Sequence, residues 1–239
     1  LFPVQRGSHC STVPAMNEHR YSEPEIDALW RAWRERRDMR HFVAGQPLPD
    51  GCLERLIDAA HLAPSVGYMQ PWRFLRITDP ALRRGIQTLV EAERLKTADA
   101  LPSRREEFLG VKIEGLADCA EVLVVILMPG RDKHIVGRRT LPQMDIASVG
   151  CAIQNMWLAA RAEGIGLGWV SFFDPLALAG LLQLPPDAEP LAVLCLGPVP
   201  EFYPRPMFET AGWGARLPRN QVLFENRWPH DAEPTPTPY

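Results

Sequence analysis

An aspartate stands inside a cluster of three arginines near the start of the chain, in the stretch RRDMR at positions 36–40. Guanidinium groups form forked hydrogen bonds with phosphate, so Arg36, Arg37 and Arg40 are candidates for holding an anion. Asp38 is either an ion-pair partner that neutralises these arginines or a carboxylate that acts as a base. From the residues alone the ion-pair role is the commoner one, and nearby positive charge is expected to keep Asp38 ionised.

Three later stretches also combine residue types suited to contact with a ligand. APSVGYMQPW (63–72) joins a helix end to a strand through a turn that exposes backbone groups and the hydroxyl of Ser65. GLGWVSFFD (166–174) is a glycine-rich entry to a strand, where the bare backbone lets a planar ring come close. ARLPRN (215–220) adds Arg216, another candidate for phosphate binding. Each stretch alone is also typical of an ordinary turn or solvated surface, so only their combination favours a ligand site.

Other familiar catalytic patterns are absent from the sequence or stand in the wrong context. GIGLG (164–168) closes a predicted helix and leads into a strand, whereas a dinucleotide-binding loop follows a strand and opens a helix. The chain has no GxxxxGK[ST], HExxH or GxSxG motif, and its five cysteines include no CxxC pair. His61 falls on an apolar helix and is expected to be structural. No metal is therefore expected.

The composition indicates a globular chain without a strongly charged partner. The chain has 239 residues, 46% of them hydrophobic, and its formal net charge of −3 gives no reason to expect nucleic acid or an anionic membrane as partner. The longest apolar run, VLVVILM (122–128), has the length of a buried strand and is too short to cross a bilayer. The scattered cysteines are typical of reduced core residues, which favours a cytoplasmic location.

Both ends of the chain are expected to lie outside the fold. LFPVQRGSHC at 1–10 lacks the apolar core of a secretion signal, and RGSH within it resembles the remnant of an expression tag. The polar, proline-rich end at 230–239 is expected to be disordered. Residues 1–20 are therefore set apart as disordered or tag-derived, and residues 21–229 are expected to form a single domain.

Hydrophobic periodicity predicts the helices and strands that would position these stretches. A capping box of Ser22 and Glu25 begins a first helix that runs to about Arg36. Further helices are expected at 48–64, 80–98, 104–119, 145–164 and 175–184, and strands at 71–78, 121–129, 165–173 and 190–197. The apolar stripe of the helix at 145–164 consists of Ile146, Val149, Ile153, Met156, Trp157 and Ala160. The pattern predicts an α+β fold in which helices cover a sheet.

The order and spacing of the four stretches resemble those of the nitroreductase-like FMN flavoproteins, over about residues 22–228. RRDMR and ARLP correspond to motifs that meet the FMN phosphate, APSVGYMQPW to a loop that lines the cofactor, and GLGWVSFF to the segment that faces the flavin ring. Two departures narrow the resemblance: Asp38 replaces a small hydroxyl residue, and Tyr68, followed by Met69, replaces an asparagine. RRDxR, APSVG[FY]MQPW, GWVS and GWxxRLP together resemble the BluB-type 5,6-dimethylbenzimidazole synthases.

This resemblance implies a nitroreductase-like fold with a central, mostly antiparallel sheet flanked by helices, in an intertwined homodimer with FMN at the subunit interface. It implies that reduced FMN and O2 are consumed, and that the flavin is fragmented to 5,6-dimethylbenzimidazole, the lower-ligand base of vitamin B12, with loss of erythrose 4-phosphate. Because no nicotinamide-binding motif is present, a separate NAD(P)H-dependent flavin reductase is expected to supply reduced FMN. Two alternatives remain: a reductase of flavin, nitro compounds or cob(II)yrinic acid a,c-diamide that recycles its FMN, and an FMN-binding protein without catalysis.

The same resemblance assigns roles to individual residues. Asp38 is expected to be the catalytic base beside the ribityl chain, and Ser171 is expected to orient O2 at the reduced ring. The cofactor contacts that it implies are Arg36, Arg37, Arg40, Pro64, Ser65, Tyr68, Met69, Gln70, Trp169, Val170, Phe172 and Arg216. Tyr68 and Met69 either close over the flavin or are ordinary core residues. Asp145 is expected first as a structural acid in the first turn of its helix and second as a substrate contact.

Overall fold

The computed structural model describes residues 19–228. The chain divides into two compact units, Leu1–Arg34 and Glu35–Tyr239. The expectations for the N-terminal segment up to residue 18 and for the tail at 230–239 lie outside the described residues. Within residues 19–228, no helix is both long and apolar enough to cross a membrane.

The described part of the first unit contains most of one helix, α1 (Glu23–Glu35). It begins at the predicted capping box, where the Glu25 carboxylate accepts hydrogen bonds from the backbone N–H of Ser22 at 2.9 Å and from its hydroxyl at 2.6 Å. None of the helix residues is buried, and the apolar Trp30 and Trp33 are 49% and 47% exposed. The helix therefore begins at a local signal, and its two tryptophans stay half-exposed among the described residues.

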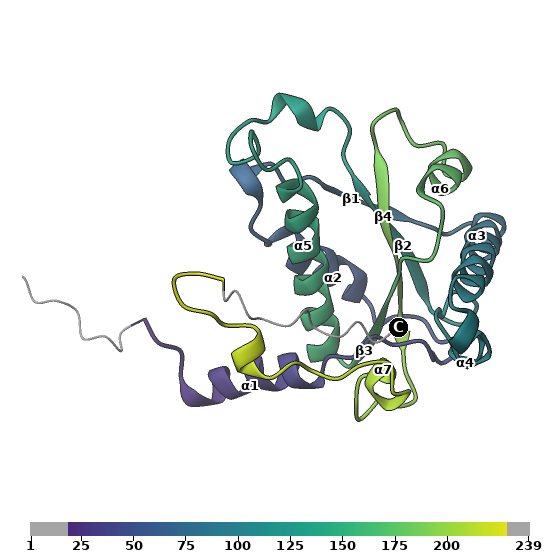
Figure 1. The fold of residues 1–239 in the computed structure, drawn as a ribbon, viewed down its shortest axis with the longest axis horizontal. Helices are drawn as coiled ribbons and strands as arrows, with labels where there is room; N and C mark the ends of the chain where they lie inside the picture. Colours follow the sequence, from purple (N-terminus) through teal and green to yellow (C-terminus); the bar gives the residue numbers. More distant parts are fainter. Residues whose placement is uncertain (1–18, 229–239) are drawn as a thin grey trace, which may run out of the picture. The chain divides into compact units, whose positions relative to one another are not determined.

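A four-stranded antiparallel sheet forms the centre of the second unit, in the order β1-β2-β4-β3 (Figure 1). The strands are β1 (Trp72–Arg76), β2 (Glu121–Leu127), β3 (Ile165–Val170) and β4 (Glu189–Pro198). Each matches a predicted strand, although β3 ends earlier than predicted, so Ser171 and Phe172 follow the strand instead of lying in it. The expectation of an antiparallel sheet flanked by helices is confirmed.

Helices cover both faces of this sheet, as Figure 1 shows. On one face lie α2 (Cys52–His61) and α5 (Met144–Ala162), and on the other lie α3 (Pro80–Asp99), α4 (Arg105–Gly110) and α6 (Pro175–Leu181). A short helix, α7 (Met207–Thr210), follows β4. The apolar stripe predicted on α5 is buried except for Ile146, which is 48% exposed.

Alternation of side chains along the strands divides the core into two layers. On β2, the even-numbered residues from Val122 to Ile126 pack with α3, α4 and α6, whereas the odd-numbered residues from Leu123 to Leu127 pack with α2 and α5. A strand covered on both faces needs an apolar residue at every position, which explains the unbroken apolar run in the sequence.

One predicted helix is much shorter than expected. The sequence predicts a helix at 104–119, but α4 has only 6 residues and Val111 after it is extended. Val111 and Ile113 are β-branched and Gly115 has no side chain, so all three disfavour a helix. Gly115 also lies against Phe42, because a Cβ on it would be 2.3 Å from that ring. The segment therefore packs as irregular chain against the core.

Candidate functional site

The arginine-rich segment runs along the outer edge of β3. Asp38 forms an isolated parallel bridge with Leu167, and the Met39 N–H donates to the Leu167 carbonyl at 3.0 Å. This approach requires Gly168, because a Cβ there would lie 2.2 Å from the Met39 carbonyl oxygen and 2.8 Å from Nη1 of Arg40. The sequence predicts that the glycines of this strand leave room for a planar ring. At Gly168, however, the missing side chain leaves room for the chain's own backbone at Met39.

Asp38, Arg40 and Trp169 form a closed set of hydrogen bonds between this segment and β3. The two carboxylate oxygens of Asp38 accept hydrogen bonds from the two terminal nitrogens of Arg40. Oδ1 of Asp38 also accepts from the Trp169 N–H at 2.9 Å, and Nη2 of Arg40 donates to the Trp169 carbonyl at 3.0 Å. The Asp38 side chain is 39% exposed, so its carboxylate is fixed from behind and still reaches the surface.

The position of Arg40 differs from the one expected for a residue that contacts the FMN phosphate. The residue is 4% exposed, and both of its terminal nitrogens donate within the chain. In this geometry its guanidinium serves Asp38 and β3 instead of facing solvent. The backbone N–H of Arg40 also donates, at 3.1 Å, to the hydroxyl of Tyr203, a residue that sequence reasoning missed because EFYPRP carries no recognisable motif.

Burial raises the pKa of Asp38 above its ordinary value. The positive charge of Arg40, the hydrogen bond from Trp169 and the charge of Arg36 lower the pKa, but they are outweighed by burial. The prediction from the sequence took account only of the neighbouring positive charge, since burial cannot be read from RRDMR. A raised pKa makes an ionised carboxylate a stronger proton acceptor than an ordinary aspartate.

Arg36, beside Asp38, is the centre of a cluster of three arginines with Arg37 and Arg216. The guanidinium of Arg36 stacks on the Trp157 ring, 4.3 Å from the ring centroid. Arg216 comes from the far end of the chain and lies close enough for its charge to act on Arg36. Burial lowers the pKa of Arg36; the negative charge of Asp38 opposes this shift, and the positive charges of Arg37 and Arg216 add to it. Like charges in a partly desolvated cluster are stabilised by a bound anion, so these residues suit a phosphate.

Hydrogen bonds to carbonyl groups fix the backbone that carries these arginines. The terminal nitrogens of Arg37 donate to the carbonyls of Arg36 at 2.7 Å and Pro204 at 2.9 Å. On α5, the Trp157 indole N–H donates to the Arg37 carbonyl at 3.0 Å. Trp157 looks like an ordinary core residue in the sequence, since it belongs to an apolar helical stripe, and its contacts with Arg36 and Arg37 could not be read from that spacing.

Ser171, the second residue expected to act in catalysis, lies just beyond the end of β3. Ser171 is exposed and follows the strand directly, two residues after Trp169, whose N–H binds Asp38. Val170 between them is fully buried, so only its backbone can face a ligand. Phe172 is half-buried and packs against Phe108, with ring centroids 5.9 Å apart.

The loop between α2 and β1 has a strained backbone. Its 3₁₀ turn spans Val66–Tyr68, and the φ angles of Tyr68 and Gln70 are 54° and 49°. Such angles in residues with side chains cost about 1–3 kcal/mol each and persist only where the surroundings hold them, often at functional sites. The Ser65 hydroxyl, expected to face a ligand, holds the loop by accepting a hydrogen bond from the Gln70 N–H at 3.0 Å.

The two bulky residues of this loop have different environments. Met69 is 7% exposed and is a core residue, whereas Tyr68 is 84% exposed. Met69 therefore has the environment of an ordinary core residue, whereas Tyr68 is open to solvent. Pro64 is exposed, and Ser65 and Gln70 are half-buried.

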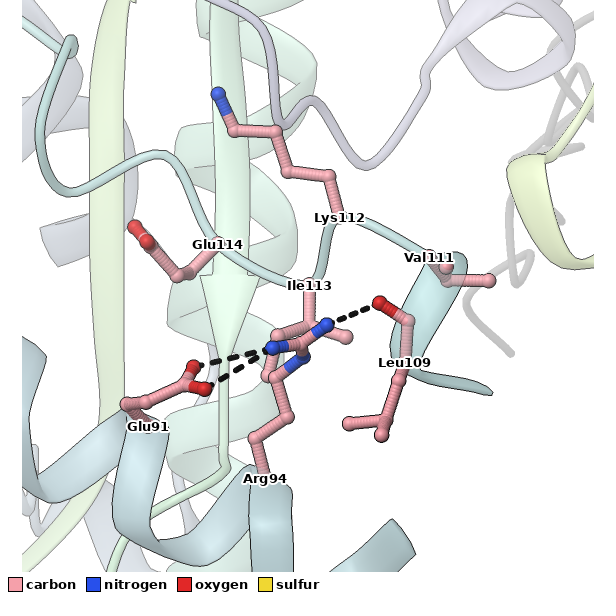
Figure 2. A pocket seen from close by; sticks show the side chains of 8 residues that line it. Glu91, Arg94, Leu109, Val111, Lys112, Ile113 and Glu114 are labelled. Carbon is pink, nitrogen blue, oxygen red and sulfur yellow. Dashed lines mark hydrogen bonds and ion pairs between the residues drawn. The ribbon is translucent and has the colours of Figure 1, made fainter. Parts of the chain in front are cut away.

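Three cavities of the described chain are lined by neither Asp38 nor Ser171. One of about 300 Å³ lies between α3 and the chain after α4 (Figure 2). In it Arg94 donates to the Glu91 carboxylate at 3.1 and 3.2 Å and to the Leu109 carbonyl, so its charge is satisfied within the chain. A second, of about 580 Å³, lies between α2 and β1, and a third, of about 870 Å³, includes Arg216. Among residues 19–228 no group of His, Cys, Asp or Glu is placed to hold a metal.

Comparison with known proteins shows the family to which the chain belongs. The sequence model of the nitroreductase family matches residues 33–198. The chain is 39% identical over 200 residues to a 5,6-dimethylbenzimidazole synthase of Rhodospirillum rubrum, and the matched region covers 82% of this chain and 92% of that protein. It is 38% identical over 203 residues to a synthase of the same name from Rhodobacter capsulatus, and that match covers 83% of this chain and 96% of the relative. The structure of iodotyrosine deiodinase bound to FMN and 3-iodo-L-tyrosine shares the fold, with a TM-score of 0.64, 22% identity and coverage of 84% and 99%. The chain therefore belongs to the nitroreductase family, in which it groups with the 5,6-dimethylbenzimidazole synthases.

Proposed function

We propose that the protein is a 5,6-dimethylbenzimidazole synthase that consumes reduced FMN and O2 and releases erythrose 4-phosphate. The observation that carries this proposal is the position of Asp38, a partly exposed carboxylate held by Arg40 and Trp169 beside a cluster of arginines. The relatives of the same name, matched over most of both chains, support it. A flavoprotein that recycles its flavin needs no carboxylate at this position.

The residues of the cluster fit the phosphate end of FMN. Within residues 19–228, neither Arg36 nor Arg216 forms a direct ion pair with a carboxylate, although the charge of Asp38 acts on Arg36, so both guanidiniums can still bind an anion. Guanidinium groups grip a phosphate monoester by forked hydrogen bonds. Reduced FMN, when bound, supplies the electrons for O2 and the carbon atoms of the product.

Asp38 is proposed as the proton acceptor. Cutting the flavin apart requires protons to be removed from carbon and oxygen, which is the work of a positioned base. The fork of Arg40 and the N–H of Trp169 fix the direction of the carboxylate, and burial raises its pKa. Asp38 can therefore hold a proton taken from the ribityl chain and release it to solvent through its exposed side.

Ser171 is proposed to act on the same face as Asp38. Its exposed hydroxyl directly follows β3, and among the described residues it forms no hydrogen bond. A hydroxyl with an unused donor can orient O2 at the reduced ring. Tyr68 is proposed to shield this region from water, since its ring stands exposed on the strained loop.

We further propose that the protein works as a cytoplasmic homodimer, with a separate NAD(P)H-dependent flavin reductase supplying reduced FMN. Each unit of the single chain exposes apolar side chains: the tryptophans of α1 in one, and Ile135, Val136 and Ile146 in the other, at 65%, 72% and 48%. Exposed apolar surface of this kind marks an association site. Light scattering on the purified protein measures the mass, and the mass of a single chain would contradict the dimer.

The deciding experiment is aerobic incubation of the protein with chemically reduced FMN, followed by mass detection of 5,6-dimethylbenzimidazole and erythrose 4-phosphate. Asp38→Asn should still bind FMN but form no product, whereas Asp50→Asn, at an exposed position before α2, should behave as wild type. Quantitative return of yellow flavin without the benzimidazole would instead support a reductase that recycles FMN. Product formation by Asp38→Asn would remove Asp38 from the role of base.

A further inference from the structure

A buried carboxylate in the first turn of α5 joins two arginines. Asp145 is 4% exposed, and its Oδ2 accepts hydrogen bonds from Nε of Arg131 at 3.1 Å and from Nε of Arg138 at 3.2 Å. The arginine side chains are 13% and 10% exposed. Buried charges are tolerated when each is well paired, and Arg131 also donates to the carbonyls of Met128 and Asp187, both at 2.8 Å.

Both arginines belong to the loop of residues 131–141, which connects β2 to α5; Arg131 begins the loop and Arg138 lies near its end. Nη1 of Arg138 donates to the carbonyl of Arg131 at 3.1 Å, which closes the loop on itself. Oδ2 of Asp145 thus binds both Arg131 and Arg138, the two ends of the segment 131–138 that this hydrogen bond closes. Loss of this carboxylate would remove the one group that joins the two guanidiniums, and each would keep only its own outer carboxylate partner, Glu189 for Arg131 and Asp132 for Arg138.

This loop packs directly on the 64–70 loop that is proposed to line FMN. A Cβ on Gly67 would lie 2.8 Å from the Val136 carbonyl oxygen, and a Cβ on Gly137 would lie 2.9 Å from Cγ2 of Val66. Both glycines have positive φ, 52° and 70°. The two loops therefore touch at two points where neither backbone has room for another carbon atom.

The same turn of α5 also holds the 64–70 loop. The Ser148 hydroxyl accepts a hydrogen bond from the Val66 N–H at 3.0 Å and donates to the Met144 carbonyl at 2.7 Å. Ser148 is 5% exposed, so water does not replace this contact. Asp145 and Ser148 together connect the start of α5 to two loops that also contact each other.

We propose that Asp145 is a positioning residue for FMN. Through Arg131 and Arg138 it fixes the 131–141 loop, which supports the strained backbone of residues 66–70 in the conformation that meets the flavin. The inference rests on the proposed function in one respect, because it takes FMN as the ligand of the 64–70 loop. The positive φ angles of Tyr68 and Gln70 need support from their surroundings, and the 131–141 loop provides it.

The test compares Asp145→Asn with Asp132→Asn as a matched control. Asp132 also bonds Arg138, at 3.1 Å, but its side chain is fully exposed. Hydrogen exchange of backbone amides in the 64–70 and 131–141 loops, without ligand, should become about tenfold faster in Asp145→Asn alone. The Kd for FMN and the KM for reduced FMN should rise about tenfold, while turnover at saturating substrate stays within about twofold of wild type.

Each outcome decides the inference. Unchanged exchange in the 64–70 loop, or faster exchange with unchanged FMN affinity, would overturn it, and so would a loss of turnover with an unchanged KM. If Asp145→Asn does not fold, Arg138→Lys keeps the charge but loses the guanidinium contact, and it should shift exchange and affinity in the same direction. If wild-type protein binds FMN but makes no benzimidazole, the proposed function fails while exchange and affinity still decide the role of Asp145.

Discussion

The backbone N–H of Trp169 donates to the carboxylate of Asp38 at 2.9 Å, so the sheet itself holds the candidate base. The two residues are 131 positions apart in the chain and meet because the arginine segment runs along the edge of β3. Arg40 grips the same carboxylate from the buried side. The direction and the proton affinity of Asp38 therefore depend on the edge of β3 and on Arg40, and the contact with Arg40 can be changed by substitution.

Replacing Arg40 by glutamine should move the acid limb of product formation to higher pH. Arg40 lowers the pKa of Asp38, whereas burial raises it, so removal of the guanidinium leaves burial less opposed. Asp38 must be ionised to accept a proton, and its activity is lost as the pH falls through its pKa. A higher pKa places that loss at a higher pH. Single-turnover rates with saturating reduced FMN, measured across the pH range, give the position of the limb.

The control for this experiment is Arg40→Lys, which keeps a positive charge but cannot form the fork. Its acid limb should move less than that of Arg40→Gln. Melting temperatures show whether either variant is folded, since Arg40 is buried. An acid limb that stays in place in a folded Arg40→Gln variant would mean that Asp38 does not control the pH dependence.

Replacing Arg216 by glutamine should weaken the binding of FMN far more than that of riboflavin. Arg216 acts on Arg36 through its charge, and the proposal places a phosphate between them. Riboflavin lacks the phosphate, so it cannot use this contact. We expect about a tenfold loss of affinity for FMN and little change for riboflavin, measured by flavin fluorescence at fixed salt. Arg227→Gln, at another exposed arginine, is the control, and equal losses for both ligands would contradict phosphate contact.

Local sequence signals predict most of the fold. Ser22 and Glu25 mark the start of α1. The strand β2 is recognisable because a strand buried on both sides must be apolar at nearly every position. The helix predicted at 104–119 ends at Gly110, because Ile113, Leu116 and Cys119 join the buried core as irregular chain and Gly115 lies against Phe42, which depends on tertiary contacts. Helical periodicity cannot exclude a buried loop whose apolar residues have similar spacing.

The contacts of the candidate site residues are less predictable from the sequence than the fold. RRDMR indicates an anion site, and the structure places Arg36 and Arg37 near Arg216. No sequence pattern distinguishes Arg40, which turns inward to Asp38, from its neighbours. Arg40 turns inward because Gly168 lets its segment come close to β3. The family resemblance, in contrast, assigns the same phosphate contact to all three arginines of the motif.

Gly168→Ala should destabilise the protein strongly. A Cβ at this position would meet the Met39 carbonyl at 2.2 Å, a distance that the backbone must relieve by moving away from β3. We expect a loss of about 3 kcal/mol in the free energy of unfolding, at the upper end of the range for overpacking. Gly180→Ala in α6, where a Cβ meets nothing within 4 Å, should be neutral or stabilising by up to about 1 kcal/mol. Denaturant unfolding measures both, and equal effects would contradict a close approach at β3.

Ser171→Ala should slow product formation and leave both FMN binding and stability unchanged. The residue is exposed and, within residues 19–228, its hydroxyl has no hydrogen-bond partner, so its removal should change the free energy of unfolding by less than about 0.5 kcal/mol. Loss of a hydroxyl that orients O2 should lower the single-turnover rate by about 10- to 100-fold. A larger share of the O2 consumed should then leave as hydrogen peroxide, because flavin oxidation no longer leads to cleavage. A wild-type rate in Ser171→Ala would show that other groups orient O2. The backbone N–H groups at the end of β3 would then be the next candidates.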